Sequence, residues 1–172
     1  MSSGQPNPSV VLFLDRTHES HLMIKMLRGI GAAFQRHGTF YKPDEDDHVW
    51  IPDVARQGWV IISGDKGIEK DGINRQSVIE SKAKVFLLDD TSSKGAEWAA
   101  SLVLAHKRIV RIAAENRGPF YCTVRKGSDA HVDESELRFH SGGGPAVPGP
   151  TPTDKEKSDG AKSGQTSPDF PS

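Results

Sequence analysis

The chain has 172 residues, and its 22 Lys and Arg nearly balance its 23 Asp and Glu, giving a net charge of −1. This length predicts one domain with an appendage. The net charge is too small to indicate nucleic-acid binding by itself. Cys122 is the only cysteine, which excludes an intramolecular disulfide and suits a reducing compartment. We find neither a signal peptide nor an apolar stretch near the roughly 20 residues of a membrane span. We therefore expect a cytoplasmic protein with no membrane partner.

The first strand and helix are predicted from an apolar run followed by a helical period. Val10–Leu14 is apolar throughout, which indicates a strand buried on both faces and ending at Asp15. Thr17 is predicted to cap the helix that follows. Its core face is expected to comprise Leu22, Met26 and Ile30, with Met23 and Leu27 beside them, and Gly31 should end it. Residues 33–37 form a weak second strand.

The next segment combines an acidic loop, a helix and a second buried strand. A loop over 39–47 carries four consecutive acids, and Asp47 stands where a helix should begin. Pro52 falls early in this helix, where proline costs least, and Gly58 should end it. Trp59–Ile62 is then an apolar run between Gly58 and Gly64, which predicts a third strand with Asp65 just beyond it.

The remaining elements continue the alternation. Ile68–Ser81 is predicted to be a helix weakened by Gly72, and Val85–Leu88 a buried strand that ends at Asp89-Asp90. A long helix follows over 94–115. The core face of this helix is marked, at spacings of three or four residues, by Trp98, Leu102, Ala105, Ile109 and Ile112. Phe120–Val124 is the last strand.

This order predicts an α/β fold: a three-layer α/β/α sandwich around a central parallel five-stranded sheet. We place the folded domain at residues 10–126 and a disordered leader at 1–9. Residues 127–140 are ambiguous, with a short fraying helix as one interpretation. More than half of residues 141–172 are Gly, Pro or Ser, which predicts a disordered tail.

Four carboxylates should meet at one edge of this sheet. Parallel strands share the edge at which they end, so Asp15, Asp65 and Asp89 follow three strands there, and Asp47 begins a helix facing the same edge. Clustered carboxylates repel one another, and Mg²⁺ or Mn²⁺ is the oxygen-seeking ion that would stabilise them. For any one aspartate alone, capping of the next helix is the commoner role.

Three motifs resemble the PIN-like domain of VapC-type toxins. They are Asp15-Arg16 after V-V-L-F-L, the D-x-x-W-I-P pattern of residues 47–52, and G-W-V-I-I-S-x-D-K-x-I over 58–68. The similarity covers residues 10–124. It implies a parallel α/β/α sandwich with an acidic, Mg²⁺- or Mn²⁺-dependent ribonuclease site, and a toxin held inactive by an antitoxin protein.

The resemblance also suggests individual site residues. Asp15, Asp47 and Asp65 match the acidic positions of the family and would hold the metal. The fourth acid has no clean counterpart: Asp89 is the nearest candidate and Glu19 the second.

Several other residues have two interpretations each. Arg16 and Lys66 flank two proposed ligands, where they would contact a substrate phosphate or simply pair with nearby acids. His18 would contact substrate or be structural. A basic stripe would follow an RNA backbone or form a solvated helix face; it comprises Lys107, Arg108 and Arg111, with Arg117 and Arg125 beyond. The core is expected to contain Trp50, Trp59, Trp98 and Cys122.

The leading hypothesis is therefore a PIN-like ribonuclease that cleaves RNA phosphodiesters with metal-activated water, with an antitoxin and a second copy of the chain as protein partners. The first alternative is a degenerate PIN-like module that binds RNA or a protein without cleaving anything. A second alternative is a receiver-type phosphoacceptor. That class needs paired acids after strand one and a lysine after strand five, whereas Asp15 precedes an arginine and Arg125-Lys126 is a loose match.

Overall fold

The computed structural model describes residues 10–89, 95–125 and 138–139, all within one unit of the chain, Met1–Gly142. The predicted leader at 1–9, the predicted tail at 141–172 and Asp90 lie outside the described residues. So does most of the ambiguous segment at 127–140.

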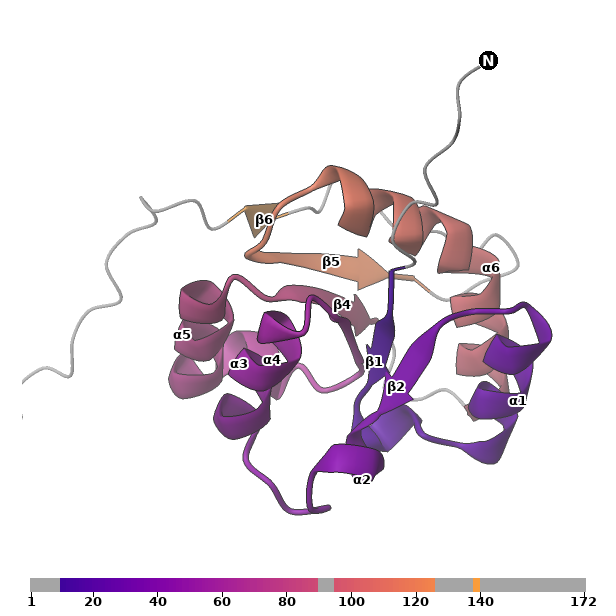
Figure 1. Cartoon of the computed structure of the whole chain (residues 1–172), viewed down its shortest axis with the longest axis horizontal. Coiled ribbons are helices and arrows are strands. Elements are labelled where there is room, and N and C mark those ends of the chain that lie inside the picture. The colour runs from indigo at the N-terminus through magenta and orange to yellow at the C-terminus, as the bar shows by residue number, and fades with distance from the viewer. Residues whose placement is uncertain (1–9, 90–94, 126–137, 140–172) are drawn as a thin grey trace, which may run out of the picture. The chain divides into compact units, whose positions relative to one another are not determined.

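Strands and helices alternate along the described chain, as the sequence predicts (Figure 1). The strands are β1 (Leu12–Leu14), β2 (Phe34–Arg36), β3 (Val60–Ser63), β4 (Lys84–Leu88), β5 (Phe120–Val124) and β6 (Arg138–Phe139). The helices are the 3₁₀ turn η1 (Arg16–His18), α1 (His21–Gly29), α2 (His37–Phe40), α3 (Asp47–Arg56), α4 (Gly67–Lys70), α5 (Gly72–Ser81) and α6 (Gly95–Glu115).

The central sheet has the strand order β2-β1-β3-β4-β5-β6, and its first five strands are all parallel. This confirms the predicted parallel five-stranded sheet. The short sixth strand was not predicted: it pairs antiparallel with β5, placing Phe139 opposite Phe120. The two described residues of the ambiguous segment are thus a strand and not a helix.

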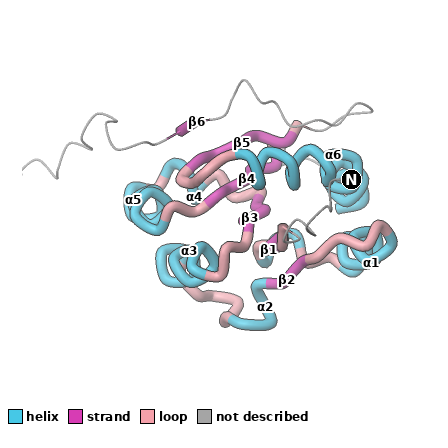
Figure 2. Tube along the Cα trace, turned by 45° about the horizontal axis from the view of Figure 1, so that its top comes forward, coloured by secondary structure: helices cyan, strands magenta, loops and turns pink. Residues whose placement is uncertain are grey.

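The sheet is covered on both faces, which gives the predicted three layers (Figure 2). Strand residues alternate between two separate core clusters, as the period of two requires. Leu12 and Leu14 pack in the cluster that includes residues of α1 and α6. Phe13 packs in the other cluster, with residues of α3, α4 and α5. The described core is therefore two apolar layers separated by the sheet.

The start and the buried face of α1 differ from the prediction. Asp15 caps η1 and Ser20, not Thr17, caps α1, because its Oγ accepts a hydrogen bond from the Met23 N–H. The buried residues are Met23, Ile24 and Leu27, whereas Leu22 and Ile30 are exposed. The later start, after a 3₁₀ turn, changes the stretch of α1 that packs on the sheet. Gly31 follows the helix at φ +70°, as expected of its ending.

Three further boundaries differ. The predicted helix over 68–81 is two helices, α4 and α5, because Asp71 interrupts the first and caps the second by accepting from the N–H groups of Ile73 and Asn74. The acidic loop is shorter than predicted, since α2 occupies its first residues. Trp59 precedes β3 and is only half-buried. No helix in the described ranges is long and apolar enough to span a bilayer.

Candidate active site

The switch point of the sheet lies between β1 and β3. The chain moves from β1 outward to β2 and then crosses back to β3 on the other side of β1. Ligands of open α/β sheets bind where strand order reverses in this way, outside the carboxyl ends of the two strands. Asp15 follows β1 and is tied to β3, because its N–H donates to the Ile62 carbonyl over 3.0 Å. The fold therefore places two of the predicted acids, Asp15 and Asp65, at the switch point.

A buried hydroxyl connects Asp15 to the segment after β3. Ser63, fully buried at the end of β3, donates its Oγ–H to Asp15 Oδ2 over 2.6 Å. The same Oγ accepts the Asp65 N–H at 3.0 Å. Asp15 Oδ1 accepts the Arg16 N–H at 2.6 Å. Because Asp15 is 2% exposed, these two donors replace water around its carboxylate and fix its orientation.

Asp47 is held by three donors at the start of α3. Its Oδ1 accepts from Trp50 Nε1 at 3.2 Å and faces Arg16 Nη2 at 3.5 Å. Its Oδ2 accepts from Asn74 Nδ2, which reaches over from α5 at 3.3 Å. Burial raises the pKa of the Asp47 carboxyl above its usual 3.8, and the charges of Asp15 and Asp65 raise it further, while Arg16 and Trp50 lower it.

These pKa effects place the three acids in one electrostatic neighbourhood. Asp65 is the exposed member, and its Oδ1 accepts the Gly67 N–H at 2.7 Å, at the start of α4. Asp65 therefore performs the helix-start role that the sequence offered as the common alternative. Asp65 also lies close enough to Asp47 for its charge to raise the pKa of the Asp47 carboxyl.

The donor chemistry fits a hard divalent cation, because three carboxylates with spare lone pairs destabilise one another and a positive charge would relieve this. The side chains are not gathered around one point, however. Within the described ranges, no group of three or more His, Cys, Asp or Glu is arranged to hold a metal ion. A single ion held by all three acids would require their side chains to turn from these positions.

The two cations predicted near the acids are both engaged. Arg16 donates to the carbonyls of Pro43 and Glu45 over 2.8 and 2.9 Å, in addition to facing Asp47. It thereby fastens the acidic loop to the end of β1. Lys66 Nζ pairs with Asp89 Oδ1 at 3.1 Å, and both side chains are more than two-fifths exposed. Asp89, the nearest candidate for a fourth acid, is thus neutralised by Lys66 in this structure.

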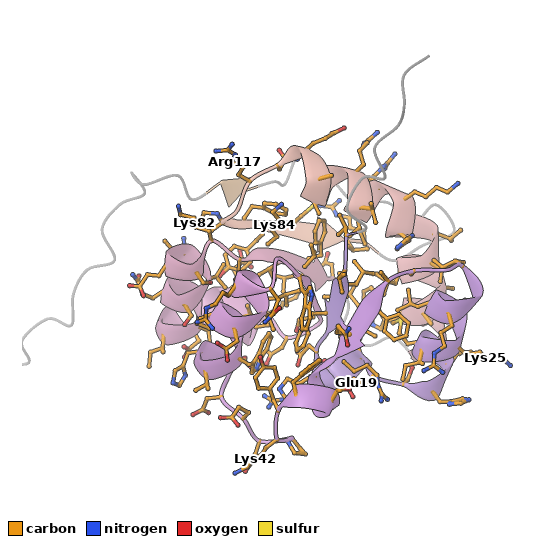
Figure 3. All side chains as sticks on the ribbon, viewed as in Figure 1. Glu19, Lys25, Lys42, Lys82, Lys84 and Arg117 are labelled. Atoms are coloured by element: carbon orange, nitrogen blue, oxygen red, sulfur yellow. The ribbon has the colours of Figure 1, made fainter. Side chains whose placement is uncertain are left out.

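The second candidate, Glu19, caps another helix. Its Oε1 accepts the Gly38 N–H at 2.6 Å, at the start of α2 (Figure 3). No contact joins Glu19 to the three acids among the described residues.

His18 is half-buried and interacts electrostatically with Asp15. Burial lowers the pKa of the His18 imidazole, and Asp15 partly opposes this. Its Nε2 has no hydrogen-bond partner within the described part of the chain. A Cβ at Gly64 would clash with that nitrogen, so a larger residue at position 64 would require the His18 side chain to move.

Sequence reasoning missed Ser63 and Asn74, which hold Asp15 and Asp47 in place. A signal for Ser63 was present, since a lone hydroxyl that ends an all-apolar strand must find a partner when it is buried. Asn74 carried no such signal, because only the packing of α5 against α3 brings it to Asp47.

The remaining predicted residues divide between the core and the surface. Trp50, Trp98 and Cys122 are buried in the core, as predicted. The basic stripe is exposed along α6 and beyond, at Lys107, Arg108, Arg111, Arg117 and Arg125.

Comparison with known proteins agrees with this architecture. A family model described as a PIN like domain matches residues 10–90. A curated protein of Mycobacterium tuberculosis, named "Putative ribonuclease VapC45", is 26% identical over 125 residues, which cover 70% of this chain and 90% of that relative. No solved structure gives a significant match. The predicted resemblance to the PIN-like domain of VapC-type proteins is thus confirmed, and residues 10–90 carry the match to the family model.

Proposed function

We propose that this protein is a metal-dependent ribonuclease that hydrolyses RNA phosphodiesters, and that it is the toxin of a toxin–antitoxin pair. The observation that carries the proposal is geometric: Ser63 Oγ contacts both Asp15 Oδ2 and the Asp65 N–H, and Arg16, the residue after Asp15, faces Asp47 Oδ1. Three acids from three segments thus share one neighbourhood at the switch point of the sheet. The ribonuclease named as a relative supports the same reaction, since the alignment covers 90% of its length.

Asp15, Asp47 and Asp65 would hold Mg²⁺ or Mn²⁺. The ion would supply a more acidic bound water and neutralise charge on the phosphate. Ser63 fixes Asp15 and Asn74 fixes Asp47, which restricts the orientations that the carboxylates can adopt. Asp89 would be an auxiliary acid, and a substrate phosphate would compete with it for Lys66.

The test is cleavage of a labelled single-stranded RNA by the purified protein with Mg²⁺, with Mn²⁺ and with EDTA. We expect EDTA to abolish cleavage and Asp65→Asn to slow it at least 100-fold. Asp53→Asn is the matched control, because Asp53 pairs with Arg56 on the exposed side of α3 and should leave the rate unchanged. Cleavage that survives both EDTA and Asp65→Asn would refute the metal site.

A specific observation favours a second candidate, a PIN-like module that binds RNA or a protein without cleaving it. The carboxylates of the described residues are not gathered around one point, and Asp89 is paired with Lys66. Titration calorimetry with Mn²⁺ separates the two candidates. A nuclease should bind Mn²⁺ in a manner that Asp65→Asn weakens, whereas a degenerate module should release no binding heat.

The toxin role adds an expectation for cells. Expression of the parent should arrest growth, and Asp65→Asn should relieve the arrest at equal protein level. The antitoxin, the homodimer and the cytoplasmic location stay predictions from the sequence.

A further inference from the structure

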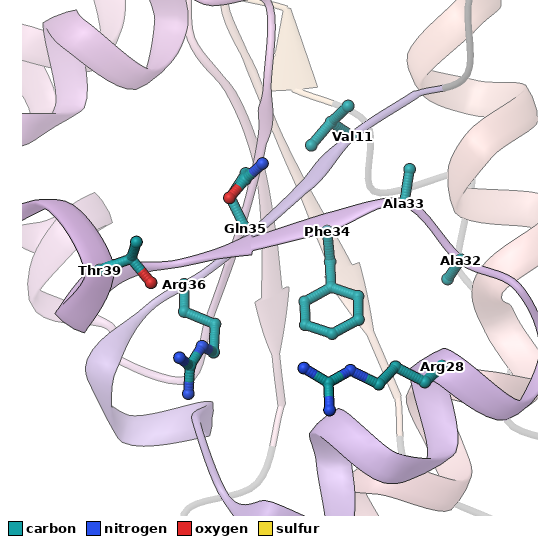
Figure 4. Close-up of a pocket in the computed structure, with 8 residues that line it drawn as sticks. All are labelled: Val11, Arg28, Ala32, Ala33, Phe34, Gln35, Arg36 and Thr39. Atoms are coloured by element: carbon teal, nitrogen blue, oxygen red, sulfur yellow. The ribbon is translucent and has the colours of Figure 1, made fainter.

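A pocket of about 490 Å³ lies along β2 (Figure 4), and none of the three acids is among its lining residues. It is lined by residues just before β1, in the last turn of α1, between α1 and β2, in β2 and in α2. These residues are Val11, Arg28, Ala32, Ala33, Phe34, Gln35, Arg36 and Thr39. The lining contains two arginines and no acid.

Neither arginine has an acidic partner among the residues that the structure describes. The guanidinium groups of Arg28 and Arg36 make no hydrogen bond or ion pair within the described ranges, and both residues are exposed. Arg16 and Arg56 behave differently, since each has a carboxylate partner. Two unneutralised guanidinium groups in one pocket are unusual in a chain whose acids slightly outnumber its Lys and Arg.

The local structure explains why these side chains meet. Residues i and i+2 of a strand point to the same face, so Phe34 and Arg36 lie on one side of β2. Arg28, in the last turn of α1, extends toward the same side (Figure 4). Phe34 packs against the core and forms the floor between the two guanidinium groups.

Helix stabilisation explains only one of the two arginines. A cation in the last turn of a helix typically gains about 0.3–1 kcal/mol from the helix dipole, which accounts for Arg28. It does not account for Arg36, which is in a strand. Two like charges in one pocket repel, and a guanidinium can donate two parallel hydrogen bonds to a phosphate. The lining therefore favours an anion, and Thr39 can add a hydroxyl donor.

The pocket reaches the same edge of the sheet as the acids. β2 is parallel to β1, and Arg36 is in register with Leu14, the residue before Asp15. Neighbouring strands are about 4.8 Å apart. An RNA strand crossing the carboxyl ends of β3 and β1 would reach the Arg36 end of the pocket next.

We propose that this pocket binds a phosphate of the RNA strand on one side of the bond that is cleaved, with Arg28 and Arg36 as its ligands. The proposal rests on the ribonuclease function above, and it adds a positioning site outside the acidic crevice. The pocket anchors the strand and takes no part in bond cleavage.

The experiment is binding of a fluorescein-labelled single-stranded RNA to the full chain in EDTA, followed by anisotropy from 50 to 200 mM salt. We expect the Arg28→Gln/Arg36→Gln variant to bind at least tenfold more weakly at the lowest salt. Loss of the one phosphate that the pocket neutralises should also reduce the slope of log affinity against log salt by about 0.7. Arg28→Lys/Arg36→Lys, which keeps the charges but loses the paired donors, should recover the slope and only part of the affinity.

Arg56→Gln/Lys82→Gln is the matched control, with the same change of charge at the end of α3 and just after α5 (Figure 3 labels Lys82). It should bind RNA like the parent. Urea unfolding of every variant checks that each is folded. If the pocket variant binds RNA as tightly as this control, the proposal is overturned. It is also overturned if the parent binds a polyglutamate peptide that the pocket variant no longer binds, while both bind RNA equally.

Cleavage of the same RNA with Mn²⁺ separates this proposal from the ribonuclease function. If the parent cleaves and the pocket variant still binds normally, the pocket proposal fails and the ribonuclease stands. If RNA binding depends on the pocket but the parent never cleaves, the ribonuclease fails and the RNA site stands.

Discussion

The hydroxyl of Ser63 makes a strong prediction, because it is buried between two groups that depend on it. Ser63→Ala removes the donor to Asp15 Oδ2 at 2.6 Å and the acceptor of the Asp65 N–H at 3.0 Å. A hydrogen bond to a charged group contributes about 1.5–3 kcal/mol, and a neutral one about 1 kcal/mol. No water can replace the hydroxyl, since Ser63 is fully buried. We expect the free energy of unfolding to fall by roughly 3 kcal/mol.

The assay is urea unfolding at pH 7. With a slope of about 2 kcal/mol per molar urea, the midpoint should fall by about 1.5 M while the slope stays constant. Ser81→Ala is the control: Ser81 Oγ donates only to the Ser77 carbonyl one turn back in α5. Because alanine favours a helix, the control should change stability by less than about 0.5 kcal/mol. If Ser63→Ala is as mild as this control, the hydroxyl does not support Asp15.

Two further predictions concern buried ionisable side chains. The pKa of Asp47 is raised above 3.8, so its ionisation opposes folding, and the stability of the parent should fall as pH rises from below 3.8 through the raised pKa. Asp47→Asn lacks this loss: urea titrations in EDTA should find it more stable than the parent at pH 7 and equal to it at low pH. A less stable variant at pH 7 would mean that the donors around Asp47 outweigh its burial. His37 is fully buried among Phe13, Tyr41 and Trp50, and neither imidazole nitrogen has a partner among the described residues. His37→Leu should therefore stabilise the fold by about 1 kcal/mol, the lower end of the cost of an unpaired buried polar group; destabilisation in the same urea assay would contradict this account.

The sequence determined the parallel α/β sandwich, because each strand and helix is recognisable from the pattern of apolar residues within its own segment. Runs such as Phe120–Val124 and the core face of α6 are recognisable from period alone, and both are as predicted. The acids after β1 and β3 followed from the same pattern, since parallel strands must end at one edge. Where competing local signals were close together, prediction failed: Ser20 rather than Thr17 caps α1, and Asp71 divides the predicted helix over 68–81.

Only the tertiary structure decided which neighbours the site residues have. Ser63 meets Asp15 across 48 positions of sequence, and Asn74 meets Asp47 across 27. Lys66 pairs with Asp89, and Arg28 and Arg36 line one pocket, because separate elements pack together there. A repeating pattern along the chain fixes which face of an element is buried. It carries no information about which side chains of two distant elements come within hydrogen-bonding distance, since that depends on packing of the whole domain.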